Sequence, residues 1–380
     1  MKSLVKSNIQ LILCVLYLIS IGNLIISPFI ALHYIDELIV LVLCAIYLII
    51  RIKSREFIYV CIILFIYLVY SLLNGINTVE ALVLDFILFT KPFVCFYVVA
   101  HTYIYVSQKY MNLFKCISFV FGIICWFYLP FISNIYDNTT AFYPICIFSA
   151  VSYLFFSKNA NSKYIAFLFL IPGLFTFRSK FIAEFIVFIY LFFFLGKRIK
   201  FSFKYIIVLL TLITSIIYVN WEKFSFYFIS GYDEGLARSL MYYTSLIIFV
   251  DYFPFGSGFA TFGTEAAARY YSPLYYKYDL HVVYGLRFED YGTSNHFFCD
   301  TFYPILAQFG IVGVFLYFIF WLKRWKEGKM ISCKIEYQLF LFLFITMIIQ
   351  NIADNTFTGP YSVPIMMTLG LLLSKQKIYA

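Results

Sequence analysis

The sequence predicts an all-α polytopic membrane protein, with about twelve transmembrane helices and one large extracytoplasmic loop. Three observations predict this fold class. Of the 380 residues, 63% are hydrophobic and 12% are charged, whereas a soluble domain carries about twice that share of charge. The apolar residues form runs suited to membrane spans, and a single long hydrophilic stretch lies between them. A water-soluble fold is therefore excluded.

Twelve apolar runs bounded by charged or turn residues mark the expected spans. The first run follows Lys2 and Lys6 and ends without a small-residue cleavage site, so we interpret it as a retained span and not as a removed signal peptide. The fourth run is long enough to be tilted, or broken at Lys91 and Pro92. The expected spans are 9–28, 38–50, 57–73, 81–106, 112–130, 142–156, 164–177, 181–195, 205–220, 297–321, 335–350 and 362–373.

The basic residues indicate the orientation. With both termini cytoplasmic, 20 of the 28 lysines and arginines fall on inner segments, against three acids, Glu56, Glu327 and Glu336. This bias is the positive-inside signal. It accounts for the net charge of +9, so the sequence gives no reason to expect a nucleic-acid partner. The nine cysteines include no CxxC pair and are odd in number, so neither a zinc site nor a disulfide framework is indicated.

The chain is expected to have three parts. Residues 1–220 contain spans one to nine, residues 221–296 form the extracytoplasmic loop, and residues 297–380 contain spans ten to twelve. A loop of this length is usually either functional or disordered. Twelve tyrosines and Trp221 argue against disorder, because disordered segments are poor in aromatic residues. We therefore expect a folded, functional loop.

Within the loop, residues 234–250 are predicted to form a helix. Leu236, Leu240, Tyr243, Ile247 and Val250 recur at three- and four-residue spacing, and such a stripe would let the helix lie on the membrane surface. Glycines and a proline follow and predict a tight turn where the backbone approaches a ligand. That turn contains Pro254, Gly256, Gly258 and Gly263, and the rest of the loop is expected to be irregular.

Three of the basic side chains expected on the outer face, where the positive-inside rule disfavours them, are candidates for ligand binding. Arg238 stands early in the loop helix, and Arg178 and Lys180 lie in the short turn between spans seven and eight. A guanidinium is a planar, permanently charged donor that suits a phosphate. The alternative for Arg238 is an arginine that snorkels to lipid headgroups, and the alternative for Lys180 is an ion pair with Glu184, one helical turn later.

His296 stands at the entrance to the tenth span. A neutral imidazole there can take a proton from a sugar hydroxyl or donate to a phosphate oxygen. Glu289, Asp290 and Asp300 are near it in sequence and could supply a base or orient the ring. The spacing of these groups does not suggest a metal site, and no metal or other cofactor is expected.

Ionisable residues inside the predicted spans are functional candidates by default. They are Asp85, Lys91 and Glu184, with His101 near the inner end of the fourth span. Asp85 and Lys91 are six residues apart and do not form an ideal helical pair. We therefore expect Lys91 either to pair across the bundle or to meet an anionic ligand.

Several short motifs resemble the superfamily of O-antigen polymerases and O-antigen ligases. In that family an arginine begins a helix in the large periplasmic loop, a proline–glycine turn follows, and a histidine or asparagine pair precedes the next span. The matching stretches are Gly235-Leu-Ala-Arg238, Pro254-Phe-Gly256-Ser-Gly258-Phe, Ser294-Asn295-His296-Phe-Phe and Gln308-Phe-Gly310-Ile-Val-Gly313, with Phe175-Thr-Phe-Arg178 resembling the family's Ser-Arg element. Ligases carry His-Asn and Ser-Arg where this chain has Asn295-His296 and Phe177-Arg178, which favours the polymerase branch.

The resemblance implies a GT-C-like glycosyltransferase in the bacterial cytoplasmic membrane. It would polymerise undecaprenyl-diphosphate-linked oligosaccharide repeat units for O-antigen, capsule or exopolysaccharide, with membrane lipid around it and a chain-length regulator and a flippase as partners. Arg178 and Arg238 would bind the diphosphate, and His296 or a nearby carboxylate would accept the proton of the attacking hydroxyl. The substrate-binding residues would be Lys180, Glu289, Asp290, Asp300, Lys91 and Tyr242, with the loop tyrosines stacking on sugars.

Two other functions stay open at this stage. A ligase would transfer the glycan to a lipid A core or to protein instead of to another repeat unit. A flippase for lipid-linked oligosaccharide belongs to a different class, and transporters of that kind commonly show repeated halves and midplane sites on broken helices. The halves of this chain show no repeat, and its single large loop also speaks against a flippase.

Overall fold

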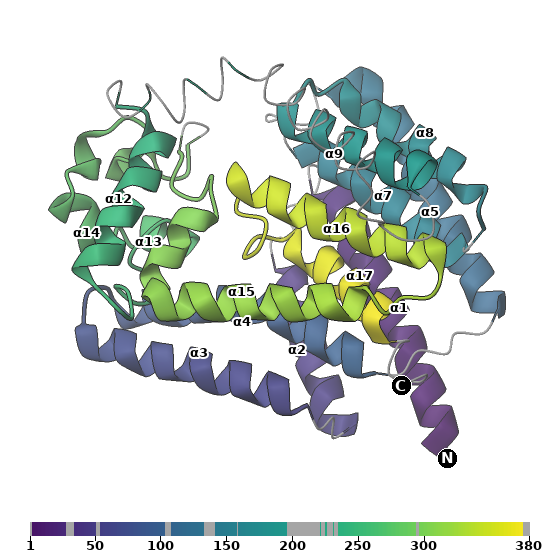
Figure 1. The fold of residues 1–380 in the computed structure, drawn as a ribbon, viewed down its shortest axis with the longest axis horizontal. Helices are drawn as coiled ribbons and strands as arrows, with labels where there is room; N and C mark the ends of the chain where they lie inside the picture. Colours follow the sequence, from purple (N-terminus) through teal and green to yellow (C-terminus); the bar gives the residue numbers. More distant parts are fainter. Residues whose placement is uncertain are drawn as a thin grey trace.

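The computed structural model of the chain describes residues 2–27, 34–50, 54–102, 108–132, 141–157, 159–195, 221, 225, 231, 235–293 and 296–374. Within these ranges every regular element is a helix (Figure 1), so the all-α prediction is confirmed for the described residues. Five helical stretches are long and apolar enough to cross a membrane, namely Arg55–Asn74, Val79–His101, Gln108–Phe131, Tyr303–Gly328 and Lys334–Ile352.

A helix lies at the place of each expected span except 205–220, which is outside the described residues. Several of these apolar helices are shorter than a full span, so the number of twelve crossings stays a prediction. The helices of the bundle are α1 (Lys2–Ile26), α2 (Ile35–Ile50), α3 (Arg55–Asn74), α4 (Val79–His101), α5 (Gln108–Tyr128), α7 (Phe142–Ser157), α8 (Ser162–Leu174), α9 (Ser179–Ile189), α15 (Gly310–Gly328), α16 (Lys334–Ile352) and α17 (Ser362–Ser374).

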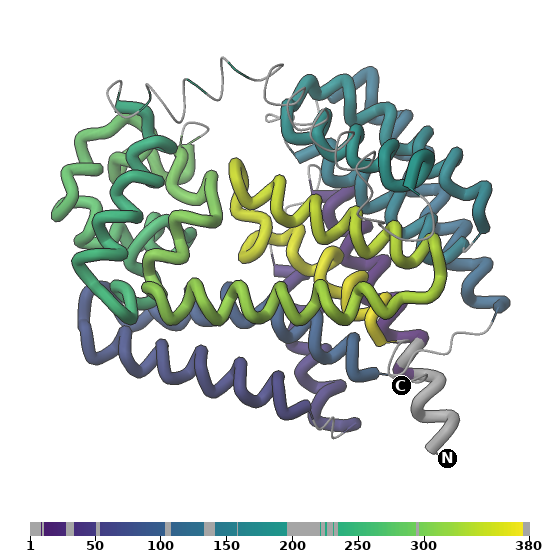
Figure 2. The backbone as a smooth tube through the Cα atoms, viewed as in Figure 1, coloured from purple at the N-terminus to yellow at the C-terminus, as the bar shows by residue number. Residues whose placement is uncertain are grey.

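Helix α4 is central to the bundle. It packs against α2, α3 and α17, and α17 in turn contacts α1 (Figure 2). The C-terminal half of α4 is buried almost all round, which explains why its sequence is apolar on every side. Of the two possibilities for this run, the break at Lys91 and Pro92 does not occur, because α4 continues through Pro92 to His101. Helices α5, α7 and α8 form a second group beside this one.

The predicted loop forms an ordered unit at one end of the bundle, shown in green in Figure 1. We call residues 235–293 and 296–309 the loop unit, the end of the bundle that carries it the loop end, and the opposite end the far end. The loop unit contains α12 (Ala237–Asp251), α13 (Glu265–Arg269), α14 (Pro273–Lys277) and short 3-10 segments. Its own core includes Met241, Ile248, Phe262, Tyr275 and Phe298, all with no exposed surface.

The predicted helix of the loop is present as α12, but the apolar stripe is not the face that packs. Met241 and Ile248 are buried in the loop unit, whereas Tyr243 and Val250 of the stripe are exposed. The other expected members, such as Leu240, are only partly buried against the core. The stripe is thus available to a membrane surface, and its contact with one stays a prediction.

The predicted turn after α12 approaches protein backbone and not an open ligand site. Gly258 N donates to Gln308 O over 2.8 Å, and a Cβ on Gly256 would meet Gly310 N at 2.4 Å. A Cβ on Gly310, which has φ +56°, would meet Pro254 O at 2.2 Å. Two stretches that carry the family resemblance therefore interlock, and we call this contact between residues 254–262 and 307–312 the backbone lock.

Side chains of α3, α4 and the turn between them bind further backbone groups of the lock. Ser71 Oγ accepts a hydrogen bond from Phe259 N over 2.8 Å, and Asp85 accepts one from Ala260 N over 2.6 Å. Asn77 donates to Ala260 O over 2.6 Å. Asp85 was a functional candidate from its position in a span. Its fully buried carboxylate instead holds the non-helical backbone that enters between the helix ends.

The tenth span begins later than the hydrophobic pattern predicts. Residues 297–302 are irregular and belong to the loop unit, residues Tyr303–Phe309 form a 3-10 helix, and the α-helix starts at Gly310. Pro304 stands at the start of the 3-10 segment, and Gly310 has the positive φ that follows it. Asp300, Thr301 and Gln308 interrupt the apolar run across these changes. The predicted span extends through these residues, which places its start too early.

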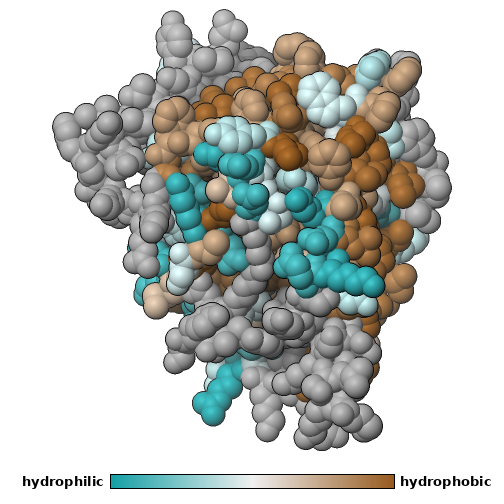
Figure 3. Space-filling view, turned by 90° about the vertical axis from the view of Figure 1, so that its right-hand side faces the viewer, coloured by the Kyte–Doolittle hydropathy of each residue, from teal (hydrophilic) through white to brown (hydrophobic). Residues whose placement is uncertain are grey.

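The far end has the polar surface expected of a bundle end. Seen from the side opposite the loop unit, hydrophilic residues gather in one patch and hydrophobic surface borders it (Figure 3). Basic residues at the far ends of described helices include Arg55, Lys163, Arg324 and Lys334. That the far end faces the cytoplasm stays a prediction.

The backbone lock predicts a difference between two glycines. Gly310→Ala and Gly75→Ala both place a Cβ on a residue of positive φ, which costs about 1–2 kcal/mol. At Gly75 nothing lies within 4 Å of that Cβ, whereas at Gly310 the lock must open. We expect Gly310→Ala to lose about 3 kcal/mol or more of unfolding free energy in detergent. Equal losses of unfolding free energy in the two variants would show that the close approach of Gly310 to Pro254 leaves no less room than the surroundings of Gly75.

The orientation predicts the signals of two reporter fusions. A reporter joined after residue 265, in the loop unit, should be active outside the cytoplasm, and one joined after residue 327, at the far end of α15, should be active inside it. Alkaline phosphatase and a fluorescent protein give opposite signals in the two compartments. Exchanged signals would show that the loop unit faces the cytoplasm and that the predicted orientation is wrong.

Candidate functional site

The candidate site is built around the end of α16. The last carbonyl groups of a helix lack partners within the helix. Here Tyr242, from α12 of the loop unit, donates its hydroxyl to Ile352 O over 2.8 Å. Lys180, from the start of α9, donates to the next carbonyl, Ala353 O, over 3.1 Å. The loop unit and the bundle thus meet at two successive carbonyl groups of one helix end.

Lys180 takes a different acidic partner from the one expected. Its Nζ lies 2.6 Å from Asp354 Oδ2 and 5.6 Å from the ring centre of Tyr143, and its predicted pair with Glu184 is not formed. Glu184 lies one turn deeper along α9 and is buried. The side chain of Lys180 instead reaches toward the loop end, where Asp354 follows α16.

Arg178 stands next to Lys180 at the N-cap of α9. It is half-buried and interacts electrostatically with Tyr143, the same ring that Lys180 contacts. Tyr143 begins α7 with no exposed surface. Both basic residues predicted in the turn between α8 and α9 therefore lie at one place, beside the end of α16.

Arg238 approaches the site from the loop unit. It lies one helical turn before Tyr242 on α12, and positions four apart share a helix face. Its Nη2 lies 2.6 Å from Asp300 Oδ2, with about 30% of each side chain exposed. Burial raises the pKa of Tyr242, nearby Tyr303 raises it further, and the charge of Arg238 opposes the shift. Tyr242 therefore stays protonated and able to donate.

In the described part of the chain, the contacts of His296 are with Thr293 and Tyr291. Its Nδ1 lies 2.7 Å from Thr293 O, and its ring centre lies 6.2 Å from that of Tyr291. A carbonyl oxygen only accepts, so Nδ1 carries the proton in this contact and Nε2 keeps the lone pair that a general base needs. The ring is half-buried and so remains within reach of a ligand.

Two of the predicted acids have local partners. Asp290 accepts hydrogen bonds from Gly285 N over 2.8 Å and from Arg287 N over 3.1 Å, which closes a turn of the loop unit. Glu289 lies 4.0 Å from Arg287 with three quarters of its side chain exposed. Of the three acids predicted around His296, Asp300 is the one that the structure brings to Arg238.

Lys91 is distant from this site. It is 2% exposed, and its Nζ lies 2.5 Å from Asp36 and 3.8 Å from Glu37, at the start of α2. Of the two expectations for Lys91, the structure forms the pair across the bundle. Asp36, which the sequence pattern places in an outer loop, is buried with it.

Sequence reasoning missed an acid in the core of the loop unit. Glu265 accepts the hydroxyl of Tyr291 over 2.5 Å and the thiol of Cys299 over 3.6 Å. Cys299 directly precedes Asp300, and Tyr291 is near His296 in sequence. Glu265 therefore connects the two segments that carry the predicted site residues Asp300 and His296. Thr264 caps α13 in front of it, and a threonine before an acid is a helix-start signal that the sequence does contain.

An apolar groove opens below the site, between α15 and α16. It encloses about 450 Å³ and is lined by Trp321, Trp325, Phe344 and other apolar side chains. Tyr303 lines its loop end and donates to Ile348 O over 3.3 Å, and Tyr303 also acts electrostatically on Tyr242. The groove therefore runs from the far end of the bundle to the foot of the cluster around Arg238 and Lys180.

No metal site is found within the part of the chain that the structure describes, since no three His, Cys, Asp or Glu side chains there could hold an ion together. Comparison of the chain with protein-family models, with curated proteins and with solved structures finds no match. What the site can do chemically therefore follows from its own side chains.

The contacts of Glu265 predict the reactivity of Cys299. Burial raises the pKa of the Cys299 thiol well above its ordinary value, and the negative charges of Glu265 and Asp300 raise it further. At mildly alkaline pH in detergent, maleimide should label exposed Cys333 and leave Cys299 largely unmodified. Glu265→Gln should increase the labelling of Cys299, measured by peptide mass spectrometry. Rapid labelling of Cys299 in the unmodified chain would contradict the closed core.

Proposed function

We propose that this protein is a membrane glycosyltransferase that polymerises oligosaccharide repeat units carried on a polyprenyl diphosphate, at the outer face of a bacterial cytoplasmic membrane. One observation carries the proposal. Lys180 of the bundle and Tyr242 of the loop unit bind successive carbonyl groups at the end of α16, with Arg238 one helical turn from Tyr242 and an apolar groove directly below. A long lipid with an anionic head suits that combination of charge and groove.

The head of the substrate would lie at the end of α16. Three basic side chains, Arg178, Lys180 and Arg238, outnumber the two carboxylates there, Asp300 and Asp354. The ion pairs Lys180–Asp354 and Arg238–Asp300 are partly exposed, so exchanging a carboxylate for a diphosphate oxygen costs little. Arginine can bind such oxygens in pairs, and Tyr242 is a neutral donor beside them.

The reaction needs few further groups. The hydroxyl oxygen of the acceptor sugar attacks C1 of the donor sugar, the bond between C1 and the diphosphate oxygen breaks, and polyprenyl diphosphate leaves. The basic residues stabilise the negative charge that develops on the leaving group. His296 accepts the proton of the attacking hydroxyl at Nε2, which its contact with Thr293 leaves free for this role.

The groove between α15 and α16 suits the polyprenyl chain. Its walls are aromatic and aliphatic, and it lies within helices long and apolar enough to span a membrane. The exposed aromatic residues of the loop unit supply flat surfaces for sugar rings. They include Tyr243, Tyr276, Tyr284 and Phe288.

Replacing the guanidinium of Arg238 tests the diphosphate site. Lysine keeps the charge but lacks the planar pair of donors, so Arg238→Lys should lose at least about 90% of polymer formation. Arg287→Lys is the matched control, because Arg287 is a partly exposed arginine of the same loop unit away from α16. Polymer made from purified lipid-linked repeat units gives the measurement. Full activity of Arg238→Lys, with normal protein amounts, would remove Arg238 from the site.

Deleting the gene tests the acceptor. A polymerase joins one lipid-linked repeat to another, so a strain without it should display at most a single repeat unit on its surface. Gel electrophoresis of surface glycans distinguishes single units from long chains. Long polymer that accumulates on the lipid carrier beneath a bare surface would instead assign ligase activity to this protein.

A further inference from the structure

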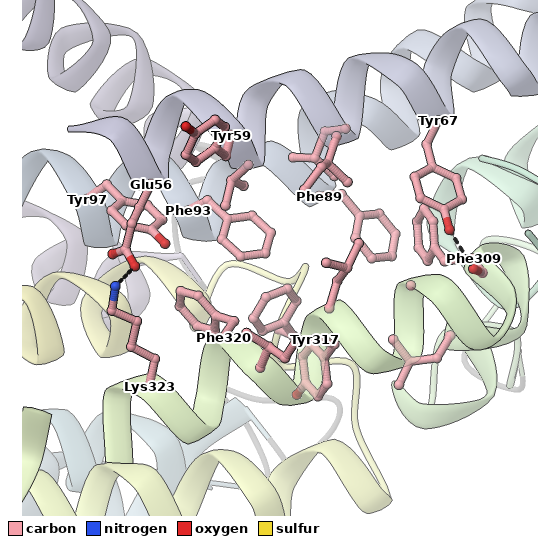
Figure 4. A pocket seen from close by; sticks show the side chains of 18 of the residues that line it. Glu56, Tyr59, Tyr67, Phe89, Phe93, Tyr97, Phe309, Tyr317, Phe320 and Lys323 are labelled. Carbon is pink, nitrogen blue, oxygen red and sulfur yellow. Dashed lines mark hydrogen bonds and ion pairs between the residues drawn. The ribbon is translucent and has the colours of Figure 1, made fainter. Parts of the chain in front are cut away.

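A second groove lies on the opposite side of α15, between α3, α4 and α15 (Figure 4). It encloses about 250 Å³. Along most of its length the lining is aromatic and aliphatic, with Tyr59, Phe93, Tyr317 and Phe320 facing the space. The proposed function makes no use of this groove.

The loop end of this groove is closed. The rings of Phe89 and Phe309 meet edge to face with centres 4.7 Å apart, and Phe302 packs beside them. Tyr67 donates its hydroxyl to Phe309 O over 2.7 Å, which joins α3 to the 3-10 segment. Figure 4 shows this bond at one end of the row of rings. A lipid whose head lies at the candidate site would have to break these contacts to enter.

The far end of the groove is polar. Glu56 of α3 forms an ion pair with Lys323 of α15 and accepts a hydrogen bond from Arg324 over 3.1 Å. Figure 4 shows the first pair at the end opposite Tyr67. Arg324 is 2% exposed, and its Nε is buried without a hydrogen-bond partner. A buried guanidinium donor left unpaired at the mouth of an apolar groove indicates a missing acceptor.

The charge around this mouth favours an anion. Four basic residues lie at this end of α3 and α15, against two acids. Lys323 is about half exposed, so it can turn from Glu56 to another acceptor at little cost. The basic residues are Arg55, Lys323, Arg324 and Lys326, and the acids are Glu56 and Glu327.

We propose that this groove binds one anionic phospholipid, with an acyl chain along α3 and α15 and the phosphate beside Lys323 and Arg324. Basic pockets between transmembrane helices hold anionic headgroups in this way. The apolar walls suit the acyl chain, and the closed loop end requires the headgroup to lie at the far end. The unpaired Arg324 Nε provides a donor for the phosphate. The inference is independent of the polymerase proposal, since it concerns another groove at the other end of the bundle.

Lipid binding to the purified full-length protein tests this inference. The protein is delipidated in detergent and titrated with phosphatidylglycerol or phosphatidylcholine, and native mass spectrometry counts the bound molecules. We expect one tightly bound phosphatidylglycerol and weaker binding of phosphatidylcholine. Lys323→Gln should weaken phosphatidylglycerol binding about fivefold, because a basic residue contributes roughly that much at a lipid surface. Lys163→Gln, a lysine at the far end of α8, should leave it unchanged.

A second pair of variants tests the groove itself. Ile319→Trp fills the groove and should abolish the tight binding, whereas Phe315→Trp changes an exposed position of α15 outside it and should not. Equal binding of both lipids, or tight binding by Ile319→Trp, would overturn the inference. Displacement of phosphatidylglycerol by undecaprenyl phosphate would also overturn it, and would assign this groove to the polymerase substrate. All readouts measure binding, so they are unaffected if the proposed activity fails.

Discussion

The structure depends on how one stretch of non-helical backbone is satisfied at the loop end of the bundle. Residues 254–262 enter between the ends of α3 and α4, where buried N–H and C=O groups need partners. Gln308 supplies several of them, since its backbone O accepts from Gly258 N and its side-chain oxygen accepts from Thr261 N over 2.7 Å. The position of α15 follows from this lock, because Gly310 is part of it.

The lock also determines where the candidate site lies. It fixes the two ends of the loop unit against each other, α12 on one side and the 3-10 segment on the other. Tyr242 and Arg238 reach the end of α16 from α12, and Tyr303 reaches the groove from the 3-10 segment. The charged side chains and the apolar groove therefore occupy fixed relative positions without any direct bond between them.

Much of the fold could be predicted from hydrophobicity alone, because a lipid-exposed segment has no stable alternative to a helix. The start of α15 could not be predicted in this way, since residues 297–309 carry many apolar side chains on irregular and 3-10 backbone, some packed in the loop unit and others in the bundle core. Arg238 and Tyr242 could be placed together from their spacing on one helix. The partner of Lys180 could not be predicted, because Asp354 is 174 residues away and Glu184 is a nearer local candidate. The role of Asp85, a functional candidate by its position in a span, could not be predicted either, since its partner is a backbone N–H of a distant turn.

Helix α15 forms a wall of both grooves. A shift of α15 toward α3 would narrow one groove and widen the other, so a molecule that favours one width changes the affinity of the opposite groove. Such coupling is reciprocal by thermodynamic necessity. The lipids at one leaflet would then set how readily the other leaflet supplies substrate, and polymer output would respond to membrane composition without a regulatory protein.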